Sequence, residues 1–87
     1  MISVVLPAFN ESSMLNATVD SVFNYLQARD EDFQIVIVEN GSTDNTGEIG
    51  QKLADSSENI DFYHSPIADY GTALRKGFQN ARGDIVV

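Results

Sequence analysis

The chain has 87 residues, enough for one small domain. Thirteen acidic residues against five basic ones give a net charge of −8 at pH 7, which argues against nucleic acid or an anionic bilayer surface as a partner of this segment. Without cysteine the chain can form neither a disulfide nor a thiolate metal site, and no stretch approaches the roughly 20 apolar residues of a membrane span.

A first buried strand is predicted at Ile2 to Leu6, a short and mostly apolar run. Pro7 is expected to end this strand, because proline cannot donate to a strand ladder. A helix follows, running to about Arg29, with an asparagine or serine between residues 10 and 13 as its cap. Its apolar stripe consists of Leu15, Val19, Val22, Phe23 and Leu26.

The second predicted strand dominates the sequence. Ile35 to Val38 is an unbroken run of β-branched apolar residues, which indicates a strand buried on both faces. The run stops at Glu39 and Asn40, after which Gly41 allows a sharp turn and Ser42 to Asp44 supply helix-capping residue types. We therefore expect polar side chains and free backbone N–H groups outside the carboxyl end of this strand, where ligands bind in open α/β sheets.

Two more helices are predicted at 44–56 and 70–81, and two more strands at 60–64 and 85–87, with Gly83 as the cap of the last helix. The alternation of strands and helices leaves connections long enough for right-handed crossovers. It predicts a Rossmann-like, three-layer α/β sandwich with a parallel sheet of order 3-2-1-4. The third strand is expected at one edge. A last strand with nothing after it leads us to expect the front part of a longer protein and self-association through the sheet edge.

Three motifs resemble those of the inverting family 2 glycosyltransferases, in the same order along the chain. They are SVVLPAFNE at 3–11, VENGSTD at 38–44, and GTALRKG at 71–77, which is followed by ARGDIVV at 81–87. The resemblance covers essentially the whole chain and implies the nucleotide-diphospho-sugar transferase (GT-A) fold. The third motif is most similar to the polyprenyl-phosphate sugar transferases, such as dolichyl-phosphate mannosyltransferase.

The resemblance also implies a nucleotide-sugar site. In the family, the first loop lies along the nucleoside, the turn hydrogen-bonds the base through the position of Asn40, and an arginine at the position of Arg75 faces the diphosphate. The implied binding residues are Pro7, Ala8, Phe9, Asn10, Glu11, Glu39, Asn40, Gly41, Ser42 and Arg75.

Each of these residues also has a purely structural interpretation. Asn40 and its turn can serve only as a turn and helix cap, Glu11 can simply favour a helix N-terminus, and Arg75 can be a solvated charge. The turn departs from the family's Asp-Asp pattern, since Glu39 and Asn40 stand there. Asn40 can still accept a hydrogen bond from a uracil imide through its amide oxygen, without the strength of a charged acceptor.

By the same resemblance, residues 1–87 form the nucleotide-binding portion of the enzyme and stop before the Asp-x-Asp motif. That motif holds Mg²⁺ or Mn²⁺, so no metal ligand and little activity are expected of the chain alone. The expected reaction moves a sugar from a UDP- or GDP-sugar to a polyprenyl phosphate or glycan, in the cytoplasm or at the cytoplasmic face of a membrane reached through other segments. The alternative is a non-catalytic nucleotide-binding or interaction module of the same fold.

Overall fold

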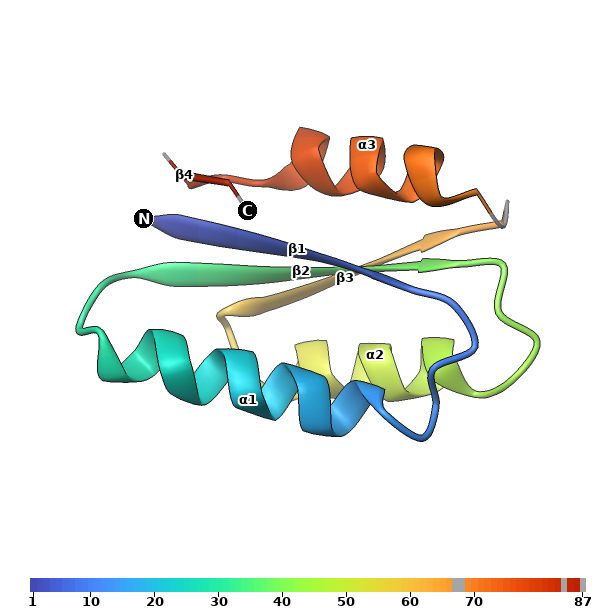
Figure 1. The fold of residues 1–87 in the computed structure, drawn as a ribbon, viewed down its shortest axis with the longest axis horizontal. Coiled ribbons are helices and arrows are strands. Elements are labelled where there is room, and N and C mark those ends of the chain that lie inside the picture. The colour runs from blue at the N-terminus through green and yellow to red at the C-terminus, as the bar shows by residue number, and fades with distance from the viewer. Residues whose placement is uncertain (67–68, 84, 87) are drawn as a thin grey trace.

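The computed structural model describes residues 1–66, 69–83 and 85–86. Strands and helices alternate along the chain, and in Figure 1 α1 and α2 lie on one side of the sheet and α3 on the other. The elements are β1 (Ile2–Ala8), α1 (Leu15–Ala28), β2 (Phe33–Asn40), α2 (Thr46–Ser56), β3 (Ile60–Ser65), α3 (Tyr70–Asn80) and β4 (Ile85–Val86). The predicted α/β class, with helices on both faces of a parallel sheet, is confirmed.

The strands are arranged in the order β3-β2-β1-β4 and every pair is parallel. β2 lies between β1 and β3, and all eight of its residues are buried, as its apolar run predicted. Of the predicted last strand, only Ile85 and Val86 are described; they pair with Ile2 and Ser3 of β1. Val87 lies outside the described residues.

Alternate residues of β2 face the two helix layers, as the geometry of a strand requires. Ile35 and Ile37 pack with Leu15, Val19 and Leu26 of α1. Val36 and Val38 pack instead with Val5 of β1, against Leu74 of α3. By the same alternation Glu39 faces the α1/α2 layer and Asn40 faces the α3 layer.

Several predicted boundaries were wrong. β1 continues through Pro7 to Ala8. Pro7 pairs with Val38 of β2 on one edge, whereas on the other edge the described residues of β4 pair only with Ile2 and Ser3. Among the described residues, no strand on that second edge needs an N–H from Pro7. The capping residue before α1 is Met14, without a side-chain cap, rather than a residue between 10 and 13. α2 begins two residues later than predicted, at Thr46, because Asp44 is engaged in the preceding turn.

The predicted role of Gly83 as a helix cap was also wrong, since α3 ends with Ala81 as its cap. Gly83 is needed for a different reason: a Cβ there would lie 2.6 Å from Ser3 Oγ and 2.8 Å from the carbonyl oxygen of Met1. Its N–H donates to Ser3 Oγ at 2.8 Å, across 80 residues of chain. The glycine therefore permits close contact between β1 and the segment that leads to β4.

A buried polar network lies at the amino ends of the strands on the α3 side. Gln34, which is fully buried on β2, accepts from the Ser3 hydroxyl at 2.8 Å and from the Arg82 N–H at 2.9 Å, and donates to Asp61 at 2.7 Å. Arg82 also reaches Asp61 with its guanidinium, at 3.2 Å. The network joins β1, β2, β3 and the end of α3, and it satisfies polar groups that would be costly to bury unpaired.

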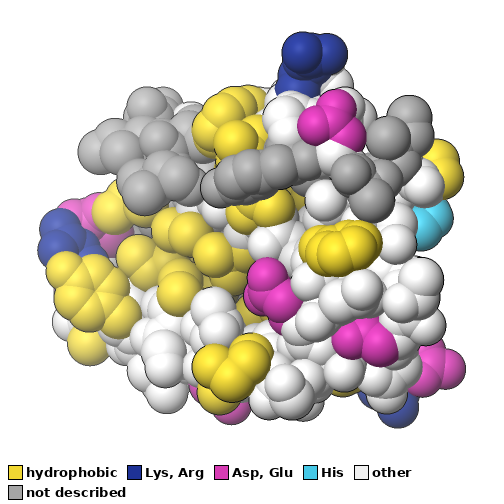
Figure 2. Space-filling model, turned by 45° about the vertical axis from the view of Figure 1, so that its right-hand side comes forward, with side chains coloured by type: hydrophobic (Ala, Val, Ile, Leu, Met, Phe, Trp, Pro, Cys, Tyr) yellow, Lys and Arg dark blue, Asp and Glu magenta, His cyan; other side chains and the backbone are white. Residues whose placement is uncertain are grey.

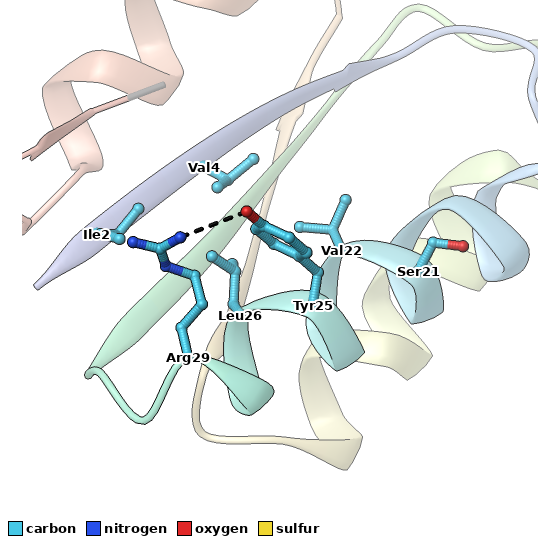
Figure 3. A pocket seen from close by; sticks show the side chains of 7 residues that line it. All are labelled: Ile2, Val4, Ser21, Val22, Tyr25, Leu26 and Arg29. Carbon is cyan, nitrogen blue, oxygen red and sulfur yellow. Dashed lines mark hydrogen bonds between the residues drawn. The ribbon is translucent and has the colours of Figure 1, made fainter.

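An apolar groove opens on the other face of the sheet, between α1 and β1. The cavity measures about 460 Å³, and Figure 3 shows its lining residues, with Arg29 donating to the Tyr25 hydroxyl at its rim. Hydrophobic side chains gather into patches on the face shown in Figure 2.

The expected self-association stays a prediction. No helix in the described part of the chain is long and apolar enough to cross a membrane.

The packing of α3 on the sheet depends on Gly77. A Cβ at this buried position would lie 2.2 Å from Val5 Cγ1, so Gly77→Ala must displace the Val5 side chain, the helix or the strand. We expect the variant to lower the free energy of unfolding by about 1–3 kcal/mol, measured by urea denaturation. Gly71→Ala, on the exposed first turn of the same helix, is the control and should leave stability unchanged or raise it. Equal stabilities of the two variants would contradict this packing.

Candidate functional site

Two loops lie together at the carboxyl ends of β1 and β2. The first comprises residues 9–14 and the second residues 41–45; we call them the paired loops. Their parent strands are in register, with Ala8 beside Glu39, so the loops leave the sheet at the same level, at the right-hand end of Figure 1. Gly41 has φ 64°, which confirms the sharp turn predicted after β2.

Asn10 connects the paired loops. Its amide oxygen accepts from the Thr43 N–H at 2.8 Å and from the Asp44 N–H at 3.4 Å, while its own N–H donates to Ser42 Oγ at 3.0 Å. Asn10 has φ 50°, a left-handed conformation that asparagine tolerates better than most residues. Asn10, which was predicted to touch the nucleoside, therefore joins the two loops to each other.

Asp44 and Thr46 form a second connection between the paired loops. Asp44 accepts from the Ser12 N–H at 3.3 Å, and Thr46 Oγ1 accepts from the Glu11 N–H at 2.9 Å. The Thr46 hydroxyl also donates to Asp44 Oδ1, and this hydrogen bond is the main reason that the pKa of Asp44 falls to about 2. Thr46 was missed in the sequence, because nothing local indicates that its side chain faces a loop 35 residues earlier.

Glu39 ends β2 with a carboxylate that is almost fully buried and has two partners. Oε1 contacts Nδ1 of His64 at the end of β3, and Oε2 accepts from the Ser42 N–H at 2.5 Å. Burial raises the pKa of Glu39, but the hydrogen bonds from Ser42 and His64 outweigh it, so that the pKa lies below its usual value. Glu39, one of the predicted site residues, thus holds the turn in place by accepting from the Ser42 N–H.

Four successive amides of the turn, those of residues 41–44, are hydrogen-bonded, contrary to the expectation that they would be free. Gly41 donates its N–H to the carbonyl of Ser65 at 2.9 Å, and the next three N–H groups, through Asp44, are bonded to Glu39 and Asn10. The prediction of free N–H groups was wrong because the partners come from two other parts of the chain. The turn is therefore built to present side chains rather than to cradle an anion.

Asn40 is the unusual member of the site. The residue is only 6% exposed, and its Oδ1 is the one buried side-chain oxygen or nitrogen without a hydrogen-bond partner among the described residues. A buried amide oxygen without a partner costs free energy and calls for an explanation. Its position at the end of β2, facing the α3 layer, agrees with the predicted role of contacting a ligand there.

The remaining predicted residues are spread around this centre. Pro7 and Ala8 belong to β1, and Ala8 is part of the core, whereas Phe9, the first residue of the paired loops, is 44% exposed. Glu11 has an exposed side chain at the start of the α1 turn. Arg75 is exposed on α3, where no described hydrogen bond joins it to the paired loops.

Because the pKa values of Asp44 and Glu39 are depressed in the fold, their carboxylates stabilise it above about pH 4, and this contribution is lost as the pH falls toward 2. We expect Asp44→Asn to unfold more easily than the wild type at pH 5, and the difference to shrink between pH 4 and 2. Urea denaturation at each pH measures it. Asp20→Asn, on the exposed face of α1, is the control; a difference independent of pH would contradict the assignment.

The Asn10 contact can be tested apart from its backbone strain. Asn10→Gly retains the left-handed conformation but removes the acceptor, so it should lower the free energy of unfolding by about 1 kcal/mol and speed hydrogen–deuterium exchange at the Thr43 N–H. Asn10→Asp keeps an acceptor oxygen and should protect Thr43 nearly as well as the wild type. Unchanged exchange in Asn10→Gly would show that the amide oxygen does not join the loops.

Comparison with known proteins extends these observations. The chain is 37% identical over 91 residues to glycosyltransferase AglD of Haloferax volcanii and 35% identical over 92 residues to dolichyl-phosphate beta-glucosyltransferase ALG5A of Trichomonas vaginalis. It is 26% identical over 88 residues to undecaprenyl-phosphate 4-deoxy-4-formamido-L-arabinose transferase of Proteus mirabilis. Each match covers 99% of this chain but only 14%, 28% and 27% of the relative, respectively.

The family described as glycosyl transferase family 2 matches residues 3–87, which is nearly the whole chain. The match includes both paired loops and α3, the segments whose motifs carried the resemblance. That resemblance is confirmed: the chain belongs to glycosyl transferase family 2.

Proposed function

We propose that residues 1–87 are the nucleotide-sugar-binding portion of an inverting glycosyltransferase, which transfers a sugar from a UDP- or GDP-sugar to a polyprenyl phosphate. Family membership supports the class of reaction. Two relatives have dolichyl phosphate or undecaprenyl phosphate in their names, which supports the acceptor. The chain spans 28% and 27% of these two relatives, so we propose the reaction for a longer protein that contains it.

The observation that carries the proposal is the unpartnered oxygen of Asn40. The turn amides are already engaged, and the chain has a net charge of −8, so this part of the site suits an uncharged base or ribose better than phosphates. A carboxamide suits the imide edge of uracil, because its oxygen can accept from the imide N–H while its nitrogen donates to a neighbouring carbonyl. Phe9 directly follows the strand end at which Ala8 pairs with Glu39, and in this proposal its exposed ring packs on the base.

The diphosphate and its metal fall to other residues in this proposal. Arg75, on the exposed surface of α3, is the candidate for the diphosphate. No three metal-ligating side chains come together within the described ranges, so the residues present do not fit a Mg²⁺ or Mn²⁺ site. We place the ion on carboxylates of the longer protein, and the enzyme in the cytoplasm or at the cytoplasmic face of a membrane.

Asn40 gives the sharpest test, in the longer protein that contains this chain. Asn40→Leu should weaken UDP binding by about 1–3 kcal/mol, roughly 5- to 150-fold, because the imide N–H would be buried unpaired. Asn40→Asp should change affinity by about 1 kcal/mol, since a carboxylate accepts but cannot donate. Titration calorimetry with UDP and GDP measures both, with Asn16→Leu on the exposed surface of α1 as the control.

The outcomes separate a base-reading residue from a structural one. If Asn40→Leu alters the free energy of unfolding but leaves both affinities unchanged, Asn40 is only a turn residue and the proposed base contact is wrong. If the wild type binds nucleotide yet transfers no sugar to a polyprenyl phosphate in the presence of Mg²⁺ or Mn²⁺, the non-catalytic module is the better description.

A further inference from the structure

His64 is the only histidine of the chain, and it stands at the carboxyl end of β3. Its side chain is 59% exposed, so it contributes little to the core. Its Nδ1 nevertheless contacts the carboxylate of Glu39, whose side chain is only 3% exposed. A partly exposed ring in contact with a buried carboxylate is positioned to direct that carboxylate rather than to fill space.

The contact continues into the paired loops. The second oxygen of Glu39 accepts from the Ser42 N–H, and Ser42 Oγ accepts from the Asn10 N–H. Three strand ends are therefore joined in sequence, from β3 through β2 to the loop after β1. Each hydrogen bond orients the group that makes the next one, and the last of them involves a residue that the family resemblance assigns to the nucleoside.

Besides His64, the described partner of the Glu39 carboxylate is Ser42, which acts through both its backbone N–H and its side chain. On the α2 side, Gly47 leaves room for the carboxylate, since a Cβ there would lie 3.5 Å from Oε1. A glycine cannot hydrogen-bond through a side chain. Without His64, the buried Glu39 carboxylate would lose one of its two described partner residues, and this cost favours turning the carboxylate toward water. The Ser42 N–H would then lose its acceptor.

We propose that His64 is a positioning residue of the nucleotide site: it orients Glu39, and through Glu39 and Ser42 it fixes the turn that directly follows Asn40. The inference rests on the proposed function for its ligand, a nucleoside diphosphate, and adds to it a residue on the third strand. His64 itself does not touch the nucleotide. Its influence passes entirely through the Glu39 carboxylate.

Two variants of the longer protein test this role. His64→Asn places an amide N–H near the position of Nδ1, whereas His64→Leu has no donor at all. His64→Leu should weaken UDP binding by about fivefold or more, as expected for one lost hydrogen bond, and His64→Asn should restore affinity to within about twofold of the wild type. Equal affinities for the wild type and His64→Leu would overturn the proposal, and so would equal losses in both variants.

A double-mutant cycle tests the route. In a Glu39→Ala background the His64→Leu change should have little further effect on affinity, because the side-chain acceptor through which His64 acts is gone. Additive losses would show that His64 acts by another route and would overturn the proposal.

A measurement without nucleotide separates this inference from the proposed function. Hydrogen–deuterium exchange at the Ser42 N–H should be faster in His64→Leu than in the wild type and unchanged in His64→Asn. If the wild type binds no nucleotide, the proposed function fails, and exchange at Ser42 alone then decides whether His64 orients the turn. Unchanged exchange in His64→Leu would overturn that as well.

Discussion

The complete burial of β2 is the constraint from which the rest of the structure follows. A strand with a neighbour on each edge and a helix layer on each face has no access to water, so every polar side chain on it must find a partner within the protein. Three polar residues nevertheless lie on it, and each marks a distinct part of the molecule. Gln34 organises the polar network at the amino end, Glu39 supports the turn at the carboxyl end, and Asn40 retains an oxygen without a partner.

The two ends of β2 consequently differ in kind. At the amino end both polar atoms of the Gln34 side chain have hydrogen-bond partners, and these bonds join the strands to the segment that ends α3. At the carboxyl end the backbone of the turn is equally well satisfied, yet the adjacent side chain is not. The proposed site therefore combines a turn whose described amides are bonded with one buried acceptor left over, an arrangement better suited to selective contact than to strong anion binding.

Much of the fold could be predicted from the sequence, because the relevant information is local. The unbroken apolar run at Ile35 to Val38 and the periodic apolar stripe of α1 each identify a buried element. The alternation of strands and helices along the chain predicts a parallel sheet. The family motifs likewise directed attention to Asn10, Glu39 and Asn40. Local patterns could not show which residues are hydrogen-bonded through their side chains, since the partners lie 25 to 80 residues apart in the chain.

The errors share that origin. The turn amides were expected to be free because the acceptors, Asn10 on one loop and Glu39 beneath, cannot be assigned before the loops are placed together. Pro7 was expected to end β1 because its neighbours on each edge were unknown. The contact between His64 and Glu39 likewise depends on the register of β2 and β3, in which the two residues are paired.

The position of β1 has a consequence for how the protein is made. This strand is synthesised before its two neighbours in the sheet, β2 and β4, and the Ser3 hydroxyl receives its hydrogen bond from Gly83 only after 80 further residues have been added. At translation rates of about 5–20 residues per second this interval lasts roughly 4–16 s. During that time one edge of a β-branched strand remains without its partner, so the nascent chain is a natural client for chaperones that cover exposed strands.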